Sequence, residues 1–225
     1  MKAALVGASD FNAEHFASCS FDLVVAVDGG YAHLRDAGVA PDAVVGDFDS
    51  LGFVPAGPDV RRFPPEKDES DMGLACRLAV EAGCDELVLY GCLGRRFDHT
   101  MGNIQLMLAQ ARAGRRVFAV GDGFAVAVLH AQAGKPSTLS FRAIPAEALA
   151  SGEYGNYISA FAIGGAAHGV WEHGLRYTLD GVDLPDDTTW GLSNEFAAGK
   201  ESAVSVEEGS LLVTFPLAAW EHLDR

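Results

Sequence analysis

The chain has 225 residues, with 16 Lys and Arg against 31 Asp and Glu, which gives a formal net charge of −15 at pH 7. This length allows one large domain or two small ones, and 49% hydrophobic against 21% charged residues exclude a largely disordered chain. The negative charge repels phosphate backbones, so we expect no nucleic acid among its partners.

The sequence contains no uninterrupted run of about 18 apolar residues, and its first stretch turns polar after a few positions. We therefore expect no signal peptide, no membrane association and a cytoplasmic location. The four cysteines form no C-x-x-C pattern, which argues against structural zinc and against a disulfide scaffold.

Short apolar runs alternate with helical patterns from the first residue to about residue 130. Candidate strands cover residues 3–6, 23–27, 44–45, 87–90 and 117–120. Periodicity predicts one helix that Asp68 caps and that stops at Gly83, and a second helix from near Asp98 to Gly114. This alternation indicates an α/β fold with a Rossmann-like, mostly parallel sheet and flanking helices.

After about residue 131 the composition shifts to Gly, Ser, Thr and aromatic residues. Alternating apolar runs predict strands at residues 157–163, 175–179, 203–206 and 211–215. We therefore expect an α/β domain over residues 1–135 and an all-β sandwich or barrel-like domain over residues 136–225. Residues 131–155 are the natural connection, although the Ser-Thr-Leu-Ser-Phe run within them could already be a strand.

Acidic residues follow the predicted strands of the first half at three places. They are Asp28, the pair Asp47 and Asp49, and the pair Asp68 and Asp71. Because parallel strands end at one edge of their sheet, these carboxylates should converge there. Converging carboxylates repel one another unless a divalent cation compensates them, and Mg²⁺ is commonly shared between one or two carboxylates and substrate phosphates.

The stretch from Asp47 to Asp49 has a geometric consequence of its own. If it is extended, both acids point to one side and Phe48 points into the core. Asp68 and Asp71, three residues apart at a helix start, would likewise share nearly one face. The alternative is that Asp28 and Asp49 belong to turns and that Asp68 only caps a helix.

Residues 91–99, GCLGRRFDH, connect a predicted strand to a predicted helix. Glycines, arginines and free backbone N–H groups at a helix start form an anion site, and Arg96 would add a forked donor to a phosphate. Neither the G-x-x-x-x-G-K-[ST] pattern nor a G-x-G-x-x-G after the first strand is present. On its own, this loop is equally consistent with an ordinary tight turn.

The order of these motifs resembles the thiamine pyrophosphokinase family. The motifs are DGG, GDFDS, PxEKDxSD and GxxGxRFDH in the first half, then GLRYTL and GLSNE in the second. The resemblance implies transfer of the β,γ-pyrophosphoryl group of ATP to the hydroxyl of thiamine, with magnesium and with release of AMP. It also implies a homodimer that binds thiamine where its two subunits meet.

The resemblance assigns roles to individual residues. The implied metal ligands are Asp28, Asp47, Asp49 and Asp71. The implied catalytic residues are Asp49, Asp71, Arg96 and Asp98, with Asp71 as a candidate acceptor of the hydroxyl proton. The implied nucleotide- and thiamine-binding residues are Asp28, Gly29, Asp68, Gly94, Arg96, Asp98, Tyr177, Ser193 and Asn194.

An aromatic face at Tyr177 suits a flat pyrimidine and a cationic thiazolium. Burial in a sandwich core is the alternative for Tyr177, Trp171 and Trp190. The sequence also departs from the family: Arg95 stands where a glycine is usual, Ser70 replaces a common threonine, and residues 131–170 match poorly.

Three other functions fit parts of the pattern. The first is a related pyrophosphokinase that acts on another small alcohol, such as a hydroxymethyl pterin, although the SNE block and Tyr177 favour thiamine. The second is a phosphohydrolase, because the Asp47-x-Asp49 pair resembles the D-x-D start of haloacid-dehalogenase-like phosphatases. The third is a non-catalytic sensor of thiamine diphosphate or a nucleotide, which would bind its ligand without forming AMP.

Overall fold

The structure is a computed structural model that describes residues 1–49, 51–55, 59–64, 68–132, 134–150 and 154–224. The chain forms two compact units, Met1–Leu106 with Val117–Asp122 and Met107–Arg116 with Gly123–Arg225. The domain boundary predicted at residue 135 lies just after strand β7 (Phe124–Ala131). That strand groups with the second unit because it pairs along its whole length with β13 (Ser202–Pro216).

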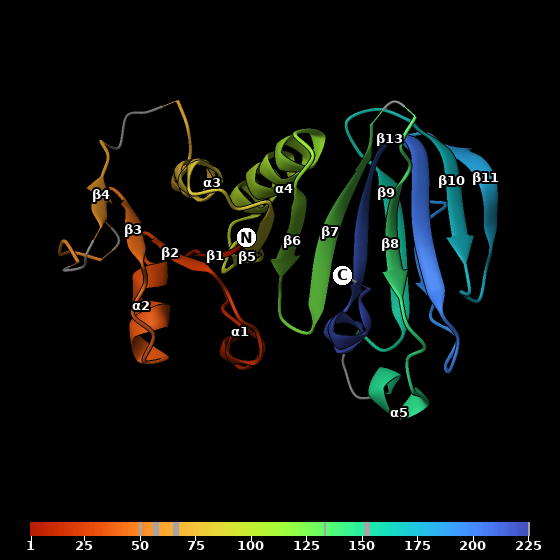
Figure 1. Ribbon diagram of the computed structural model, residues 1–225, viewed down its shortest axis with the longest axis horizontal. Coiled ribbons are helices and arrows are strands. Elements are labelled where there is room, and N and C mark those ends of the chain that lie inside the picture. Colours follow the sequence, from red (N-terminus) through yellow and green to blue (C-terminus); the bar gives the residue numbers. More distant parts are fainter. Residues whose placement is uncertain (50, 56–58, 65–67, 133, 151–153, 225) are drawn as a thin grey trace. The chain divides into compact units, whose positions relative to one another are not determined.

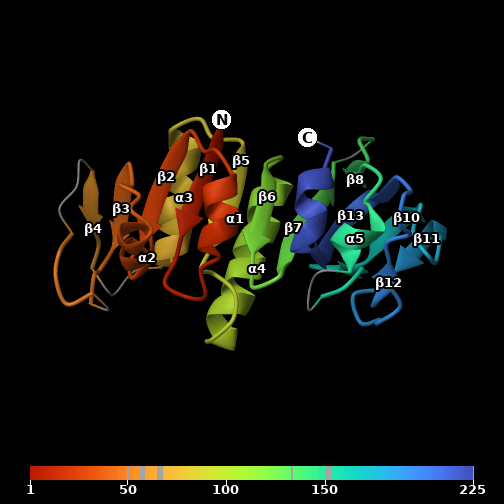
Figure 2. The same ribbon diagram turned by 90° about the horizontal axis from the view of Figure 1, so that it is seen from below.

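The first unit is an α/β layer structure, as predicted. Its strands are β1 (Lys2–Val6), β2 (Leu23–Val27), β3 (Ala43–Gly46), β4 (Val60–Arg62), β5 (Glu86–Tyr90) and β6 (Arg116–Val120). Its helices are α1 (Ala13–Ser18), α2 (Gly30–Asp36), α3 (Asp71–Glu81) and the start of α4 (Phe97–Arg112). The strand order is β6-β5-β1-β2-β3-β4, and the pairs of β1 with β2 and β5, of β2 with β3 and of β3 with β4 are parallel (Figure 2).

Helices cover both faces of this sheet: α1 and α2 lie on one face, and α3 and α4 lie on the other (Figure 1). Along the chain the strands proceed outward from β1 to β4, after which α3 returns to β5 on the other side of β1. The order therefore reverses between β1 and β5. In open α/β sheets ligands bind at such a switch point, outside the carboxyl ends of the strands.

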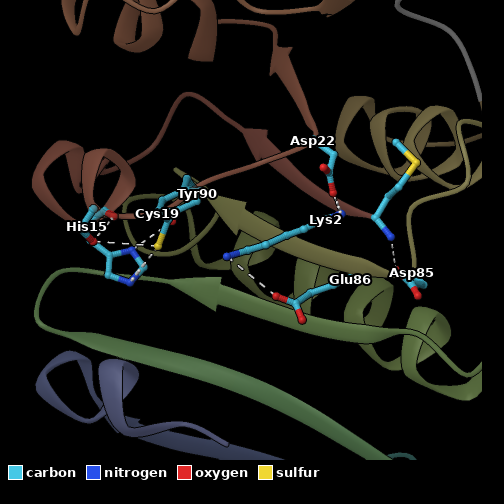
Figure 3. A network of polar contacts seen from close by, with 9 residues as sticks. Lys2, His15, Cys19, Asp22, Asp85, Glu86 and Tyr90 are labelled. Atoms are coloured by element: carbon cyan, nitrogen blue, oxygen red, sulfur yellow. Dashed lines mark hydrogen bonds and ion pairs between the residues drawn. The ribbon is translucent and has the colours of Figure 1, made fainter. Parts of the chain in front are cut away.

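The central strands are apolar on both faces. Residues 3–6 of β1 and 87–90 of β5 are completely buried, as expected of parallel strands between two helical layers. Polar contacts tie the start of β1 to its surroundings (Figure 3): the backbone N–H of Lys2 donates to Asp22 over 2.7 Å, and the terminal ammonium donates to Asp85 over 2.7 Å. Near the other end of β5, the Tyr90 hydroxyl lies 3.0 Å from His15 Nδ1.

The chains leaving β1 and β5 stay in close contact. The Gly7 N–H donates to the Tyr90 carbonyl over 2.8 Å, and Gly91 adopts φ +56°. A Cβ atom on Gly91 would lie 2.2 Å from the Gly7 carbonyl oxygen. Glycine is therefore required where the two backbones frame the switch point.

The second unit is rich in antiparallel strands, as predicted, and also contains the end of α4. Its strands are β7, β8 (Ser137–Phe141), β9 (Tyr157–Ala162), β10 (Ala167–His173), β11 (Leu179–Leu184), β12 (Asn194–Glu195) and β13, and its short helices are α5 (Ala146–Leu149) and the 3-10 helix η1 (Leu217–His222). The first part of β13 pairs with β8 and β10, and the last part pairs with β7 and β9. Its two partner sets meet near Gly209, whose φ is +93°.

Several predicted strands in this unit need correction. The predicted strands at residues 203–206 and 211–215 are parts of the single strand β13, and the strand predicted at residues 175–179 is wrong. Residues 175–178 form no strand: Leu175 makes one isolated bridge to Phe196, and the N–H groups of Arg176 and Tyr177 donate to Glu195 and Asn194. The Ser-Thr-Leu-Ser-Phe run is indeed a strand, β8. Within the described residues, no helix is long and apolar enough to cross a membrane.

Candidate active site

A cavity of about 660 Å³ opens at the switch point of the first unit. Segments that follow β1, β2, β3 and β5 line it, together with the starts of α3 and α4. Its lining residues are Gly7, Ala8, Ser9, Val27, Asp28, Asp47, Asp68, Glu69, Ser70, Asp71, Met72, Gly91, Cys92, Gly94, Arg95, Arg96, His99 and Asn103. The topology thus brings residues nearly 100 positions apart to one place.

Four of the predicted acidic residues share this cavity: Asp28, Asp47, Asp68 and Asp71. Asp49, also predicted as a ligand, is exposed and is not among the lining residues. Glu69 adds a further carboxylate to the same wall. The part of the lining that follows β2 and β3 and begins α3 is therefore strongly acidic.

Asp28 organises the neighbouring strand end as well as facing the cavity. It adopts φ +52°, and its carboxylate oxygen Oδ1 accepts a hydrogen bond of 3.0 Å from the Phe48 N–H. The carboxylate occupies the space that a side chain at Gly46 would need, since a Cβ there would lie 2.7 Å from Oδ1. Packing of Asp28 over β3 is therefore possible only above a glycine.

The 47–49 stretch is not extended, so the prediction that Asp47 and Asp49 share one side is wrong. Phe48 adopts φ +65°, and the Asp47 carboxylate turns back to accept a hydrogen bond from the Asp49 N–H over 3.0 Å. The chain turns here because the Asp28 carboxylate captures the Phe48 N–H. Phe48 is 3% exposed, which confirms the prediction that its ring points into the core.

The third acidic cluster lies at the start of α3. The helix begins at Asp71, and its N-cap is Ser70, whose hydroxyl accepts from the Gly73 N–H over 3.1 Å. The predicted cap at Asp68 is therefore wrong: a serine directly before the helix already fills that position. Asp68 and Asp71 nevertheless both face the cavity, so the acids meet by a different local geometry from the one predicted.

A second part of the lining is basic: the loop before α4 and the start of that helix contribute Gly94, Arg95, Arg96 and His99. Arg96 makes a two-pronged contact with Asp98, with nitrogen–oxygen distances of 3.2 and 2.5 Å. This contact lowers the pKa of the Asp98 carboxyl. Asp98 itself is exposed and is not a lining residue, so Arg96 is paired with a carboxylate from outside the cavity lining.

The loop also carries the departure noted in the sequence. Arg95 adopts φ +44°, and its Nε lies 3.2 Å from Asp10 Oδ1. The loop adopts a left-handed conformation at this position even though the residue is not glycine. Gly29, predicted to bind the nucleotide, is the N-cap of α2 and does not line the cavity.

Non-glycine residues with positive φ are found, within the described part of the chain, only in the predicted motifs. They are Asp28, Phe48, Arg95 and Ser193. Such conformations cost energy and tend to persist where the surrounding structure holds a functional site. Their positions support the choice of motifs independently of residue type.

The second unit holds the remaining predicted residues, around β12. Asn194 is 5% exposed, and its amide oxygen accepts from the N–H groups of Tyr177 and Glu195. Its amide nitrogen donates to the Tyr177 carbonyl and to Glu172. These four bonds use its full hydrogen-bonding capacity, so the predicted direct contact of Asn194 with a ligand does not fit the structure.

The aromatic residues near β12 are at the surface. Tyr177 and Trp190 are 57% and 59% exposed, so burial in a core, the alternative considered for them, is wrong. Tyr157 and Leu192 are also exposed, and Ser193 is exposed with φ +61°. Exposed apolar residues that form a contiguous patch are typical of binding sites for ligands or proteins.

Several lining residues belong to none of the sequence motifs. Ser9 follows β1 at the switch point, where its hydroxyl donates to the Leu93 carbonyl over 2.7 Å. Asn103 donates to the Cys92 carbonyl over 2.7 Å and so ties the loop after β5 to α4. The strand order would have pointed to Ser9, whereas no sequence signal singled out Asn103.

The comparisons with known proteins agree with this arrangement. The family model "Thiamin pyrophosphokinase, catalytic domain" matches residues 17–119, and "Thiamin pyrophosphokinase, vitamin B1 binding domain" matches residues 146–211. A thiamine pyrophosphokinase of Bacillus subtilis (strain 168) is 28% identical over 179 residues, which are 77% of this chain and 78% of that protein.

Solved structures show the same fold. The thiamine pyrophosphokinase structure from Bacillus subtilis aligns with a TM-score of 0.80 and 23% identity, covering 96% of this chain and 99% of the other. The structure of thiamin pyrophosphokinase from Geobacillus thermodenitrificans aligns with a TM-score of 0.76 and 27% identity, covering 96% and 97%. These matches favour thiamine pyrophosphokinase activity over the three alternative functions.

Proposed function

Because the chain belongs to the thiamin pyrophosphokinase family, we propose that its switch-point cavity binds ATP with Mg²⁺ and that the surface around β12 binds thiamine. The reaction transfers the β,γ-pyrophosphoryl group of ATP to the thiamine hydroxyl and releases AMP. The observation that carries the assignment of the cavity is its mixed lining, with acidic residues from β2, β3 and α3 and basic residues from the loop before α4.

The acidic part of the lining suits a hard divalent cation. Asp28, Asp47 and Asp71 offer carboxylate oxygens, which are the donors that Mg²⁺ prefers. Among the described residues no set of three or more His, Cys, Asp or Glu is close enough to hold a metal alone. The proposed cation would therefore need phosphate and water oxygens to complete its coordination, and it would neutralise phosphate charge when bound.

The basic part of the lining suits the phosphates of ATP. The start of the 16-residue helix α4 provides a positive dipole end, and Arg96 provides a forked donor. We infer that Arg96 turns from Asp98 toward the phosphates when the nucleotide binds. In this assignment Asp98 holds the guanidinium ready, and Gly94 lets the backbone approach the anion.

The attack itself requires alignment more than covalent chemistry. The thiamine hydroxyl must approach the β-phosphorus in line with the leaving AMP oxygen, and holding this geometry supplies most of the acceleration. Asp71, fixed at the first turn of α3, is the carboxylate that we assign to accept the hydroxyl proton. Asp68 adds negative charge on the same wall, and Asp49 is assigned an outer position through its backbone contact with Asp47.

The thiamine surface combines aromatic and polar groups. Tyr177 offers an exposed ring to the cationic thiazolium or the pyrimidine, an interaction worth about 0.5 to 2 kcal/mol. Ser193 offers an exposed hydroxyl beside it, and Asn194 positions the backbone of Tyr177. We also propose that the chain acts as a homodimer in the cytoplasm, because so exposed an aromatic surface suits a second copy that would close the site.

The assay is direct. The purified protein, incubated with ATP, Mg²⁺ and thiamine, is expected to form AMP and thiamine diphosphate in equal amounts. Formation of AMP only with a hydroxymethyl pterin would replace the substrate, and trapping of an aspartyl-phosphate on Asp47 would indicate a phosphohydrolase. Binding of thiamine diphosphate with no AMP from any substrate would indicate a sensor.

A further inference from the structure

Glu172 is a carboxylic acid buried in the second unit. It lies on β10 with 3% of its surface exposed, and its register neighbours on the adjacent strands are the apolar residues Leu179 and Val204. Its Oε2 accepts a hydrogen bond of 2.5 Å from the side-chain amide of Asn194. Burial of a carboxyl group is costly unless hydrogen bonds compensate it, and Asn194 supplies one such bond.

The hydrogen bond to Glu172 favours the same orientation of the Asn194 amide as the Tyr177 and Glu195 N–H groups, which donate to its oxygen. With one N–H directed at Glu172, the other N–H reaches the Tyr177 carbonyl over 2.8 Å. The amide oxygen then accepts the Tyr177 N–H over 3.0 Å. Asn194 therefore holds both backbone polar groups of Tyr177, and only one orientation of the amide allows this.

Two further contacts dock the same segment on β12. The Arg176 N–H donates to the Glu195 carbonyl over 2.9 Å, and the Arg176 guanidinium forms an ion pair with the Glu195 carboxylate. The Arg176 guanidinium carbon lies 5.4 Å from the centre of the Tyr177 ring. The Glu195 carboxylate compensates the positive charge of the Arg176 guanidinium beside the Tyr177 ring.

The result is an exposed ring on a fixed backbone. Tyr177 has two held backbone groups, yet its side chain is more than half exposed. The neighbouring Ser193 is fixed in a similar way, since its N–H donates to the Ser159 hydroxyl over 2.9 Å. A surface arranged before its ligand arrives loses less conformational entropy on binding.

We propose that Glu172 is a positioning residue for thiamine: through Asn194, it fixes the backbone of Tyr177 and so presents the exposed ring to the substrate. This inference rests on the proposed function and adds a residue that belongs to none of the motifs. Glu172 touches no substrate in this proposal. It acts only by supplying an acceptor to Asn194.

The proposal predicts which substitutions are tolerated. Glu172→Gln keeps a carbonyl acceptor at the same distance along the side chain, so Asn194 can keep its orientation. Glu172→Leu fills a similar volume but leaves one Asn194 N–H buried without an acceptor, which favours rearrangement of the amide. Glu172→Asp keeps the acid but shortens its reach by one methylene.

The experiment measures steady-state kinetics and equilibrium thiamine binding for the full chain. Glu172→Leu is expected to raise the KM and Kd for thiamine at least about tenfold, with kcat and the KM for ATP within about twofold of wild type. Glu172→Gln is expected to stay within about threefold of wild type in thiamine affinity. Glu208→Gln, a change on the exposed β13 residue, is the matched control and should leave all constants unchanged.

A double-mutant cycle tests whether the effect passes through the ring. In the Tyr177→Ala background, Glu172→Leu should change thiamine affinity less than about twofold, because the ring that it positions is gone. An unreduced effect in that background overturns the proposal. If Glu172→Leu does not fold, Glu172→Asp replaces it, and unchanged thiamine affinity in that variant overturns the proposal equally.

The two proposals fail in different ways. If the wild-type protein forms no AMP with thiamine, the proposed function is wrong. If the wild type is active and Glu172→Leu binds thiamine as tightly as wild type, only the role of Glu172 is wrong. Equal losses in thiamine and ATP constants would also overturn it, because they would indicate a general structural effect.

Discussion

The Asp28 carboxylate accepts a hydrogen bond from the backbone N–H of Phe48 over 3.0 Å, across the ends of two neighbouring parallel strands. One oxygen of this acid thus shapes the turn that carries Asp47, while the residue also lines the cavity. The Asp28 side chain therefore has a structural role at the turn and a proposed role in the cavity, and substitutions can separate the two roles.

Asp28→Asn should separate the two roles of this residue. The amide keeps an oxygen acceptor for Phe48, so the free energy of unfolding should change by less than about 1 kcal/mol, while turnover falls at least about 100-fold because the charge is lost. Asp28→Ala should lose turnover equally and also about 1.5 to 3 kcal/mol of stability. Urea unfolding and AMP release measure the two effects, and full activity of Asp28→Asn would remove Asp28 from the proposed metal site.

The close approach of β1 and β5 can be tested with a glycine pair. Gly91→Ala places a Cβ 2.2 Å from the Gly7 carbonyl oxygen, whereas Gly38, which also has positive φ, has open space around it. Gly91→Ala should therefore destabilise the protein by at least about 2 kcal/mol more than Gly38→Ala. Equal melting temperatures of the two variants would show that the strand ends separate freely.

The role of Arg96 predicts a selective kinetic effect. Arg96→Ala should raise the KM for ATP about tenfold or more and leave the KM for thiamine within about twofold, because only the phosphates lose a donor. Arg96→Lys keeps the positive charge but should still show most of the increase in the KM for ATP, since a lysine cannot form the forked contact. A change confined to the thiamine constant would place Arg96 in the other site.

Glu172 predicts a pH dependence of stability. Burial raises its pKa above the ordinary value of 4.5, although the bond from Asn194 opposes the shift. The native state therefore holds the Glu172 proton more tightly than the unfolded state does. The resulting contribution to the free energy of unfolding is complete below pH 4.5 and is lost as the pH rises toward the native pKa. The loss is at most about 1.4 kcal/mol per pH unit.

The Glu172→Gln variant cannot ionise at this position and is the control for that dependence. Urea unfolding across the pH range should show wild type losing stability relative to Glu172→Gln as the pH rises above 4.5. Parallel stability curves would show that the Glu172 carboxyl has the same pKa in the native and unfolded states.

The parallel sheet and most of its strands could be predicted from the sequence because buried parallel strands read as short apolar runs. That Asp28, Asp47 and Asp71 line one cavity followed from the rule that such strands end at one edge. The local geometry did not follow, since the turn at Phe48 depends on a long-range hydrogen bond that periodicity cannot reveal.

The second unit was harder to predict for a related reason. β13 changes partners along its length, so its two halves read as separate strands. The segment around Tyr177 is apolar and alternating like a strand, yet side-chain bonds from Asn194 hold it. The roles of Glu172 and Asn103 could not be predicted from the sequence. A single acid or amide belongs to no residue spacing that would identify its hydrogen-bond partner.

The central claim is that acids from β2, β3 and α3 jointly bind the cation that accompanies ATP. Calorimetric titration of a non-hydrolysable ATP analogue into wild type and Asp71→Asn, each with and without Mg²⁺, tests it most directly. We predict tight binding only for wild type with Mg²⁺, and a loss of at least about tenfold in the variant. Equal affinity of wild type and variant, or binding indifferent to Mg²⁺, would contradict the account.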